Sequence, residues 1–272
     1  MRIAGLGHGL FAIAAASLAI FSLAYGDFAP GQSFPAWIPG REIWVYGSAV
    51  VLLAASAGLC FSRTALPSAL TIGAYQAVWA VTGVPPILSQ PLSIGSWYGF
   101  CEALTSLLGA WILYAMLRWQ SRGSQMPIAS ERAVRGARVL FGLTCVFYGW
   151  SHFFYADYTA SMVPTWLPDG LGFAYFTGLG HIAAGIAIMV GILPRLAATL
   201  EAIMMSSFGL LVWVPSLVAQ PRPKWAGTPQ NQWSELVVTL LLAASAWIVA
   251  DSLRNRRWGF ASATHCPPRT AI

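Results

Sequence analysis

Residues 171–193 read LGFAYFTGLGHIAAGIAIMVGIL, an apolar run that contains His181 and no Asp, Glu, Lys or Arg. A helix needs about 20 predominantly apolar residues to cross the hydrocarbon core of a bilayer, so this run predicts a membrane-spanning helix. Stretches of similar character recur along the chain, at about 4–25, 43–61, 67–84, 97–117, 136–155, 196–217 and 233–251. The sequence therefore predicts an all-α membrane protein with eight transmembrane helices.

The composition points the same way. Of the 272 residues, 57% are hydrophobic and 9% are charged, and the mean hydropathy is +0.64. A soluble domain carries about a quarter charged residues, so this chain has too few to cover a globule with a hydrated surface. A soluble enzyme, a disordered protein and a nucleic-acid-binding protein are therefore poor fits. The expected partner is the lipid bilayer and not a nucleic acid.

The arginine distribution orients the predicted helices. Basic residues gather on the cytoplasmic side of membrane proteins. If the N-terminus is cytoplasmic, segment 118–138 and the tail place most of the basic residues inside, and Arg41, Arg222 and Lys224 lie outside. We therefore expect an integral protein of the plasma membrane (the inner membrane of a bacterium) with both termini in the cytoplasm.

The two halves of the chain resemble each other. An offset of about 130 residues, kept over separated blocks, indicates an internal repeat. The matching blocks are 33–39 (SFPAWIP) with 161–168 (SMVPTWLP), 84–91 (VPPILSQP) with 214–221 (VPSLVAQP), and Glu102 with Glu235.

The repeat divides the chain into units. Each half holds four predicted helices, an even number, so both halves insert in the same orientation as parallel repeats. We expect two four-helix bundles. The predicted segments are a first unit at 1–118, a cytoplasmic linker at 119–135, a second unit at 136–253 and a basic cytoplasmic tail at 254–272.

Four ionisable residues fall near the outer ends of the predicted helices. Asp27 and Glu102 belong to the first half, and His152 and Glu235 occupy the corresponding places in the second. Ionisable groups in a membrane usually face a cavity or a partner. We expect one polar pair per half, each lining an outward-facing pocket. The two carboxylates of the first half would share one proton. The imidazole and carboxylate of the second half could move a proton. The alternative is that these shallow groups extend to water.

Two ionisable residues lie deeper in the second half. His181 is near the middle of its predicted helix, among small residues that allow a neighbouring helix to approach. Glu201 lies in the next predicted helix, nearer the inner side. Together with His152 they form a hypothetical path for a proton or a ligand. The alternative is local hydrogen bonding between helices.

Aromatic residues complete the predicted ligand site. Tyr148 supplies a hydroxyl group, and the Pro-rich outer segments place Trp37 and Trp166 where they either line the pocket or anchor the protein at the membrane surface. No metal site is expected, because the four histidines are scattered and the cysteines show no CxxC pair. No cofactor motif is evident.

The second half resembles the DoxX-like membrane family. The segments that carry this resemblance are 149–153 (GWSHF), 163–168 (VPTWLP), 175–178 (YFTG) and 195–197 (RLA). The first half, with 25–28 (YGDF) and 63–65 (RTA), is similar to a diverged copy of the same four-helix unit. Some relatives are similar to a subunit of a thiosulfate:quinone oxidoreductase, and others are linked to redox-stress complexes. The resemblance thus implies a redox association, a quinone-like ligand and a soluble or membrane redox partner.

Three functions remain open at this stage. The first is binding of a quinone-like or other lipophilic small molecule, as an accessory to membrane redox chemistry. The second is transport of a small molecule, with or without a proton, through a site between the two repeats. The third is a non-catalytic scaffold. The sequence leaves open whether the protein is an enzyme.

Overall fold

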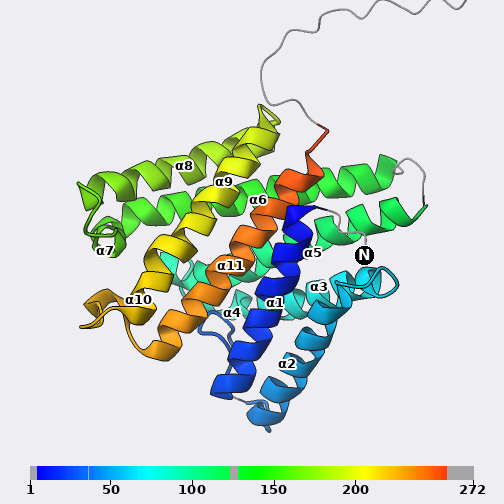
Figure 1. Cartoon of the computed structure of the whole chain (residues 1–272), viewed down its shortest axis with the longest axis horizontal. Coiled ribbons are helices and arrows are strands. Elements are labelled where there is room, and N and C mark those ends of the chain that lie inside the picture. The colour runs from blue at the N-terminus through cyan, green and yellow to red at the C-terminus, as the bar shows by residue number, and fades with distance from the viewer. Residues whose placement is uncertain (1–4, 36, 123–127, 256–272) are drawn as a thin grey trace, which may run out of the picture.

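The computed structural model describes residues 5–35, 37–122 and 128–255, and every regular element in these ranges is helical (Figure 1). The long helices are α1 (Leu6–Tyr25), α2 (Arg41–Gly58), α3 (Ala65–Thr82), α5 (Tyr98–Arg122), α6 (Ile128–Phe154), α8 (Gly170–Val190), α9 (Pro194–Phe208) and α11 (Pro229–Ser252). The short elements between them are α4 (Val84–Ser89), η1 (Ile94–Trp97), α7 (Ala156–Met162), η2 (Gly209–Trp213), α10 (Val214–Val218) and η3 (Lys224–Ala226).

Each apolar stretch of the sequence overlaps one of the long helices. Five helical segments of the described chain are long and apolar enough to cross a membrane: Leu6–Tyr25, Ile94–Gln120, Gly170–Val190, Pro194–Val218 and Pro229–Ser252. Helices α6 and α7 form a sixth if this pair, bent by 93°, counts as one span. Helices α2 and α3 are not in this group, because the charged Arg41 and Glu42 at the start of α2 and the polar Gln76 within α3 lower their mean hydropathy. The protein is thus an all-helical membrane protein, and eight spans stay a prediction.

The first and last long helices meet along their length. Helix α11 is the most buried of the candidate spans and packs against α1, α5 and α9. At one end of the bundle the backbone N–H of Gly7 donates to Asp251 (2.7 Å), and Arg138 donates to the carbonyl of Ser252 (2.8 Å). We call this the terminal end, because α1 begins there and α11 ends there, and the opposite one the distal end. The predicted cytoplasmic placement of both chain termini stays a prediction.

Neighbouring helices pack in the same order in both halves. In the first half α1 contacts α2, α2 contacts α3 and α3 contacts α5. In the second half α6 contacts α8, α8 contacts α9 and α9 contacts α11. A short helix follows the third member in each half, namely α4 and α10. Contacts of α1 with α11 and of α5 with α6 and α11 join the halves. Superposition of the halves as parallel repeats stays a prediction.

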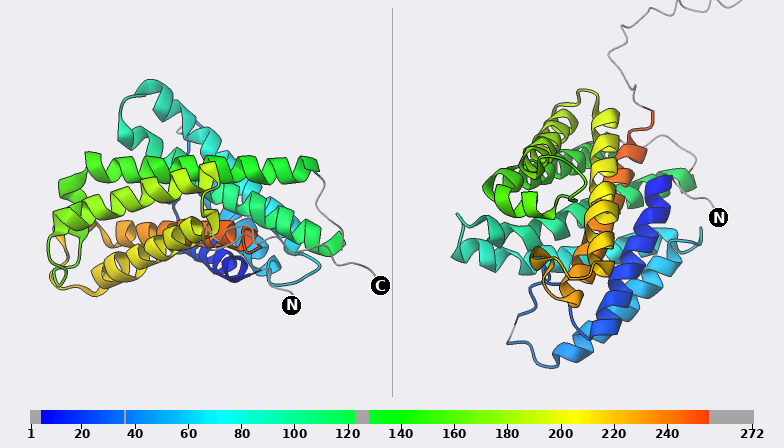
Figure 2. Two further views of the ribbon diagram at one scale, coloured as in Figure 1. Left: turned by 90° about the horizontal axis from the view of Figure 1, so that it is seen from above. Right: turned by 60° about the vertical axis from the view of Figure 1, so that its left-hand side comes forward.

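Glycines allow α6 and α8 to lie side by side (Figure 2). A Cβ atom added to Gly142 would lie 2.6 Å from the carbonyl oxygen of Gly185, and one added to Gly149 would lie 2.5 Å from that of Gly178. Close backbone approach of this kind holds helices together in lipid, where no hydrophobic effect drives them to associate. The predicted role of small residues at this interface is borne out by these contacts.

The segment between the two halves that is not helical is shorter than the predicted linker at 119–135. Helix α5 continues to Arg122 and α6 begins at Ile128, so most of residues 119–135 is helical. A helix does not end where the hydrocarbon ends, because its backbone hydrogen bonds persist when polar side chains face water. Residues 123–127, and 256–272 of the predicted tail, lie outside the described residues.

A π-helical turn, η2, lies between α9 and α10. Pro215 has no N–H and its ring clashes with the carbonyl group four residues earlier in a regular helix. The wider turn η2 directly precedes the short helix that contains this proline. It carries Leu211, Val212 and Trp213 to the wall of the site described next.

Candidate functional site

A cavity of about 1440 Å³ lies among α5, α6, α7, α8, α9 and α11. Its wall is mostly apolar and aromatic. The ionisable carboxyl and imidazole groups in the wall are Glu102, His152, Glu201 and Glu235. These four were all expected from the sequence to take part in a site. This volume exceeds the roughly 300–1,000 Å³ typical of small-molecule pockets, so a bulky or elongated ligand fits.

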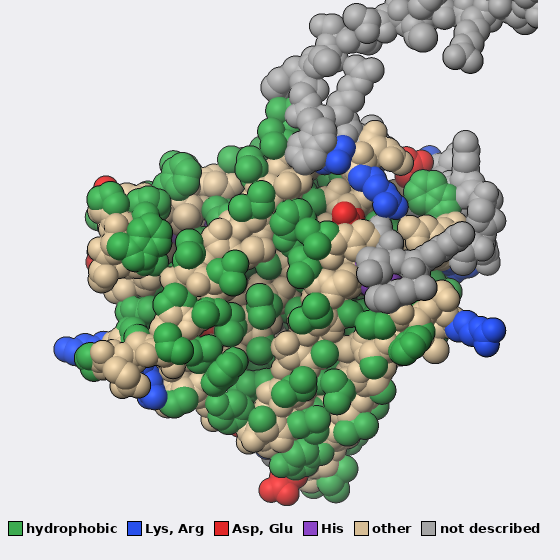
Figure 3. Space-filling model, viewed as in Figure 1, with side chains coloured by type: hydrophobic (Ala, Val, Ile, Leu, Met, Phe, Trp, Pro, Cys, Tyr) green, Lys and Arg blue, Asp and Glu red, His purple; other side chains and the backbone are tan. Residues whose placement is uncertain are grey.

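The cavity opens between α8 and α9. The two helices leave their common turn at the terminal end and diverge toward the distal end (Figure 1). Phe176, Leu200, Ile203 and Leu211 line the cavity and also remain exposed, so they form its margin. Hydrophobic side chains cover much of this face of the molecule, and Lys and Arg side chains lie at its edges (Figure 3). The opening therefore faces the surroundings that an apolar surface requires in a membrane protein, namely lipid.

The distal part of the cavity is enclosed by α7 and the segment after α10. The hydroxyl group of Tyr158 in α7 donates to the carbonyl of Trp225 in η3 (3.3 Å). Asp169 caps α8 by accepting from the backbone N–H of Gly172 (2.9 Å), and Thr228 caps α11 in the same way. These caps satisfy backbone donors that a helix start would otherwise leave open. They fix the helix ends around the cavity.

Glu102 and Glu235 face the same cavity from different halves of the chain. Their carboxyl groups are close enough to interact electrostatically with each other and with Tyr98. Within the described chain, neither has a hydrogen bond or an ion pair. Glu102 also packs on Gly31, where an added Cβ would lie 2.5 Å from its Oε2 atom.

Asp27 does not pair with Glu102, contrary to what the sequence had led us to expect. Asp27 instead forms an ion pair with Arg41 and accepts a hydrogen bond from the backbone of Phe28 (2.8 Å). Both members of the ion pair are nearly half exposed, and Asp27 does not line the cavity. Glu102 instead lines the same cavity as Glu235. One large cavity receives residues from both halves.

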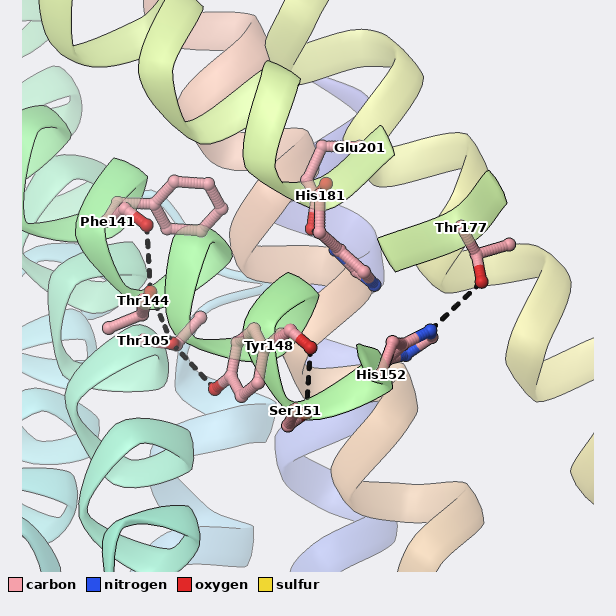
Figure 4. A network of polar contacts seen from close by, with 9 residues as sticks. All are labelled: Thr105, Phe141, Thr144, Tyr148, Ser151, His152, Thr177, His181 and Glu201. Carbon is pink, nitrogen blue, oxygen red and sulfur yellow. Dashed lines mark hydrogen bonds and ion pairs between the residues drawn. The ribbon is translucent and has the colours of Figure 1, made fainter. Parts of the chain in front are cut away.

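His152 is held by helix α8. Its Nδ1 atom lies 2.9 Å from the hydroxyl oxygen of Thr177 and 3.3 Å from the carbonyl oxygen of Ala174 (Figure 4). The Thr177 hydroxyl donates its own hydrogen to the backbone, and the carbonyl can only accept. The hydrogen-bond network thus assigns the Nδ1 proton to His152. Its Nε2 atom is left for another contact.

His181 and Glu201 form a buried pair. The Nδ1 atom of His181 lies 2.8 Å from Oε1 of Glu201, and the two side chains are 1% and 2% exposed. The rings of His181 and His152 meet edge to face, with centroids 5.2 Å apart. The structure thus brings together the three residues of the hypothetical path. Glu201 reaches the cavity, whereas His181 lies behind its wall.

One oxygen of Glu201 remains unsatisfied. Its Oε2 atom is buried and has no hydrogen-bond partner within the described residues. The Cys145 thiol lies near enough to interact with this carboxyl group.

Tyr148 lies in a neighbouring network and does not line the cavity. Its hydroxyl group is 3.0 Å from that of Thr105, which donates to Thr144 (2.9 Å) (Figure 4). This network links α5 to α6. Sequence reasoning missed Thr105 and Thr144, because a threonine in an apolar helix has no distinguishing pattern.

The two tryptophans of the Pro-rich segments lie away from the site. Trp37 is 82% exposed and Trp166 is 68% exposed, and neither lines the cavity. This placement suits anchoring at the membrane surface, the alternative reading. Among the described residues no group of three or more His, Cys, Asp or Glu side chains is placed to hold a metal ion.

Comparison with known families identifies part of the chain. Residues 133–214 match the DoxX family. The chain carries a DoxX domain. No curated protein and no solved structure matches the sequence. The DoxX domain contains His152, His181 and Glu201, whereas Glu102 and Glu235 lie outside it. The cavity is therefore completed by parts of the chain beyond the family match.

Proposed function

We propose that this membrane protein binds a lipophilic small molecule, which enters the cavity from the bilayer between α8 and α9. The observation that carries the proposal is a large apolar cavity whose margin is exposed and whose wall holds clustered ionisable groups. Such pockets use apolar walls for affinity and a few polar groups for orientation. Glu102, His152 and Glu235 are the polar contacts.

The ligand class suggested by the DoxX resemblance is a quinone, and the role an accessory one in membrane redox chemistry with a redox partner. A quinone has the required apolar ring and tail, and its oxygens need donors. With the proton on Nδ1, the Nε2 atom of His152 accepts, so it is the position for a hydroxyl group of the reduced quinol form. This assignment rests on family association.

The test is ligand binding by the full chain in lipid nanodiscs. Native mass spectrometry of the purified protein should detect a co-purified lipophilic molecule, and decylubiquinone is the probe in a thermal-shift titration. The Ala183→Phe substitution adds a ring at the cavity wall and should abolish the shift. The control is Ile186→Phe, on the same helix but exposed and outside the wall. Equal binding by the two variants would contradict the proposed site.

Transport is a second candidate, favoured by the length of the cavity. Its lining runs from Tyr158 and Pro164 at the distal end to Leu193 and Leu196 near the terminal end. Helix α8 lies along this path, and its 21 residues are about 30 Å long at 1.5 Å per residue. Proteoliposomes that accumulate a ligand only when they contain the protein would favour transport over binding alone.

We also propose that α2 and α3 cross the plasma membrane with the other long helices, as parallel repeats with cytoplasmic termini. The shared order of helix contacts supports this arrangement. Single cysteines in a cysteine-free variant test it through labelling of intact cells. A cysteine at Arg63 should stay protected from an impermeant maleimide, whereas one at Leu92 should react.

A further inference from the structure

The cavity wall has charges of one sign. It contains the carboxyl groups of Glu102, Glu201 and Glu235, and among the described lining residues there is no Lys or Arg. An acidic group in a membrane protein normally has a cationic partner or faces a functional site. Asp27 shows the first arrangement, with Arg41. Glu201 is paired with His181, whereas Glu102 and Glu235 show the second arrangement.

The acceptors in this wall lack donors. The Oε2 atom of Glu201, a residue that is 2% exposed, has no hydrogen-bond partner among the described residues apart from the nearby thiol of Cys145. The carboxyl groups of Glu102 and Glu235 make no hydrogen bond with the described residues. An unpaired carboxylate in an apolar environment is costly, and a bound positive charge removes that cost.

Aromatic rings line the same cavity as the acidic pair. Tyr98 interacts electrostatically with Glu102, Glu235 and Tyr155, which places these groups around one region at the distal end. Phe100 and Phe173 also line the cavity. Faces of aromatic rings attract organic cations, and the attraction increases when water is excluded. Carboxylates and rings together are the chemistry that recognises an ammonium or phosphonium group.

We propose that the ligand is a lipophilic cation, with its positive centre between Glu102 and Glu235 and its apolar body along the wall formed by α8 and α9. This inference rests on the proposed function and specifies its ligand class. Ionised carboxylates at Glu102 and Glu235 repel anionic amphiphiles. A neutral quinone needs donors, which an ionised carboxylate does not supply.

The experiment compares ligands that differ in charge but little in shape. Tetraphenylphosphonium is the cationic probe, and triphenylphosphine oxide and decylubiquinone are neutral ones, each titrated into the full chain in nanodiscs of neutral lipid. The variants are Glu102→Gln, Glu235→Gln and the double variant, which preserve side-chain shape. Glu42→Gln is the control, because it removes an exposed acid from the start of α2.

We expect tetraphenylphosphonium to bind more tightly than triphenylphosphine oxide. Each single substitution should raise its Kd about tenfold or more, the factor expected for loss of one charge-assisted contact, and the double variant should lose specific binding. Glu42→Gln should leave the Kd unchanged. The wild-type comparison of charged and neutral probes requires no variant to fold.

Two results overturn the inference in different ways. If the neutral probes bind in the cavity and tetraphenylphosphonium does not, or if the Gln variants bind the cation as the wild type does, the ligand class is wrong and the proposed function stands. If none of the probes binds in a manner that Ala183→Phe abolishes, both the ligand class and the proposed function fail.

Discussion

His181 in α8 and Glu201 in α9 form a buried pair joined at 2.8 Å, and the pair holds the two helices that diverge around the cavity. The rest of the α8–α9 contact is limited by their divergence toward the distal end (Figure 1). The pair therefore has a mechanical role besides any part in a proton path. Several measurements test this and the related features of the fold.

Removing the carboxyl group of Glu201 should destabilise the protein. The Glu201→Ala substitution leaves the imidazole of His181 buried without its partner, and interhelical polar contacts in membranes contribute about 0.5–2 kcal/mol. We expect a lower midpoint of thermal unfolding in detergent, measured by loss of the monodisperse peak in size-exclusion chromatography. The midpoint of the Glu201→Gln variant, which retains an acceptor, should fall less. An unchanged midpoint in Glu201→Ala would show that the pair does not hold α8 to α9.

Two glycines of α6 should respond in opposite ways to alanine. Gly142→Ala places a methyl group against the backbone of α8, so we expect a loss of about 1–3 kcal/mol, the usual range for overpacking. Gly136→Ala meets no atom within 4 Å and should be neutral or stabilising by up to about 1 kcal/mol, since alanine favours a helix. Unfolding in sodium dodecyl sulfate measures both. Equal effects would contradict the close contact.

Neutralising Asp27 should change little. The Asp27→Asn substitution weakens an ion pair whose side chains are nearly half exposed, and such pairs contribute less than about 1 kcal/mol. Because Asp27 lies outside the cavity wall, ligand binding should also be unaffected. A titration of the variant with tetraphenylphosphonium checks this. A tenfold loss of affinity would show that Asp27 contributes to ligand binding, as the sequence pattern had suggested.

The hydroxyl network between α5 and α6 should behave as a unit. Tyr148→Phe removes one hydroxyl group and Thr144→Val another, each at an expected cost of about 1 kcal/mol. Because both hydrogen bonds meet at Thr105, the double variant should lose less than the sum of the single losses. A double-mutant cycle of unfolding free energies measures the coupling. Strict additivity would show that the two contacts are independent.

The long helices and several polar positions could be predicted from the sequence because both depend on simple patterns. Runs of apolar residues locate helices, and the scarcity of charge makes Glu102, His152, Glu201 and Glu235 stand out. All four line the cavity. Glu102 and Glu235, which the repeat offset paired, line the same cavity.

The partners of those residues could not be predicted, because a repeat gives the level of a residue in the bundle and not the neighbour that it faces. Contacts of α5 with α6 and α11 join the halves, so Glu102 meets Glu235 and not Asp27. Arg41 lies fourteen positions after Asp27 in the sequence and was assigned only to an outer loop. For Trp37 and Trp166, the outer segment was compatible with pocket and surface alike, and only the packing decides.

The contact of α1 with α11 has a consequence for biogenesis. A ribosome releases α1 into the bilayer first, yet the backbone hydrogen bond from Gly7 reaches a residue 244 positions later in the chain. Until α11 is inserted, the face of α1 at Gly7 lacks the helix against which it packs in the finished protein. Chains truncated before α11 should therefore be recognised as incomplete by the proteases that survey the membrane, and only a fully synthesised chain escapes them.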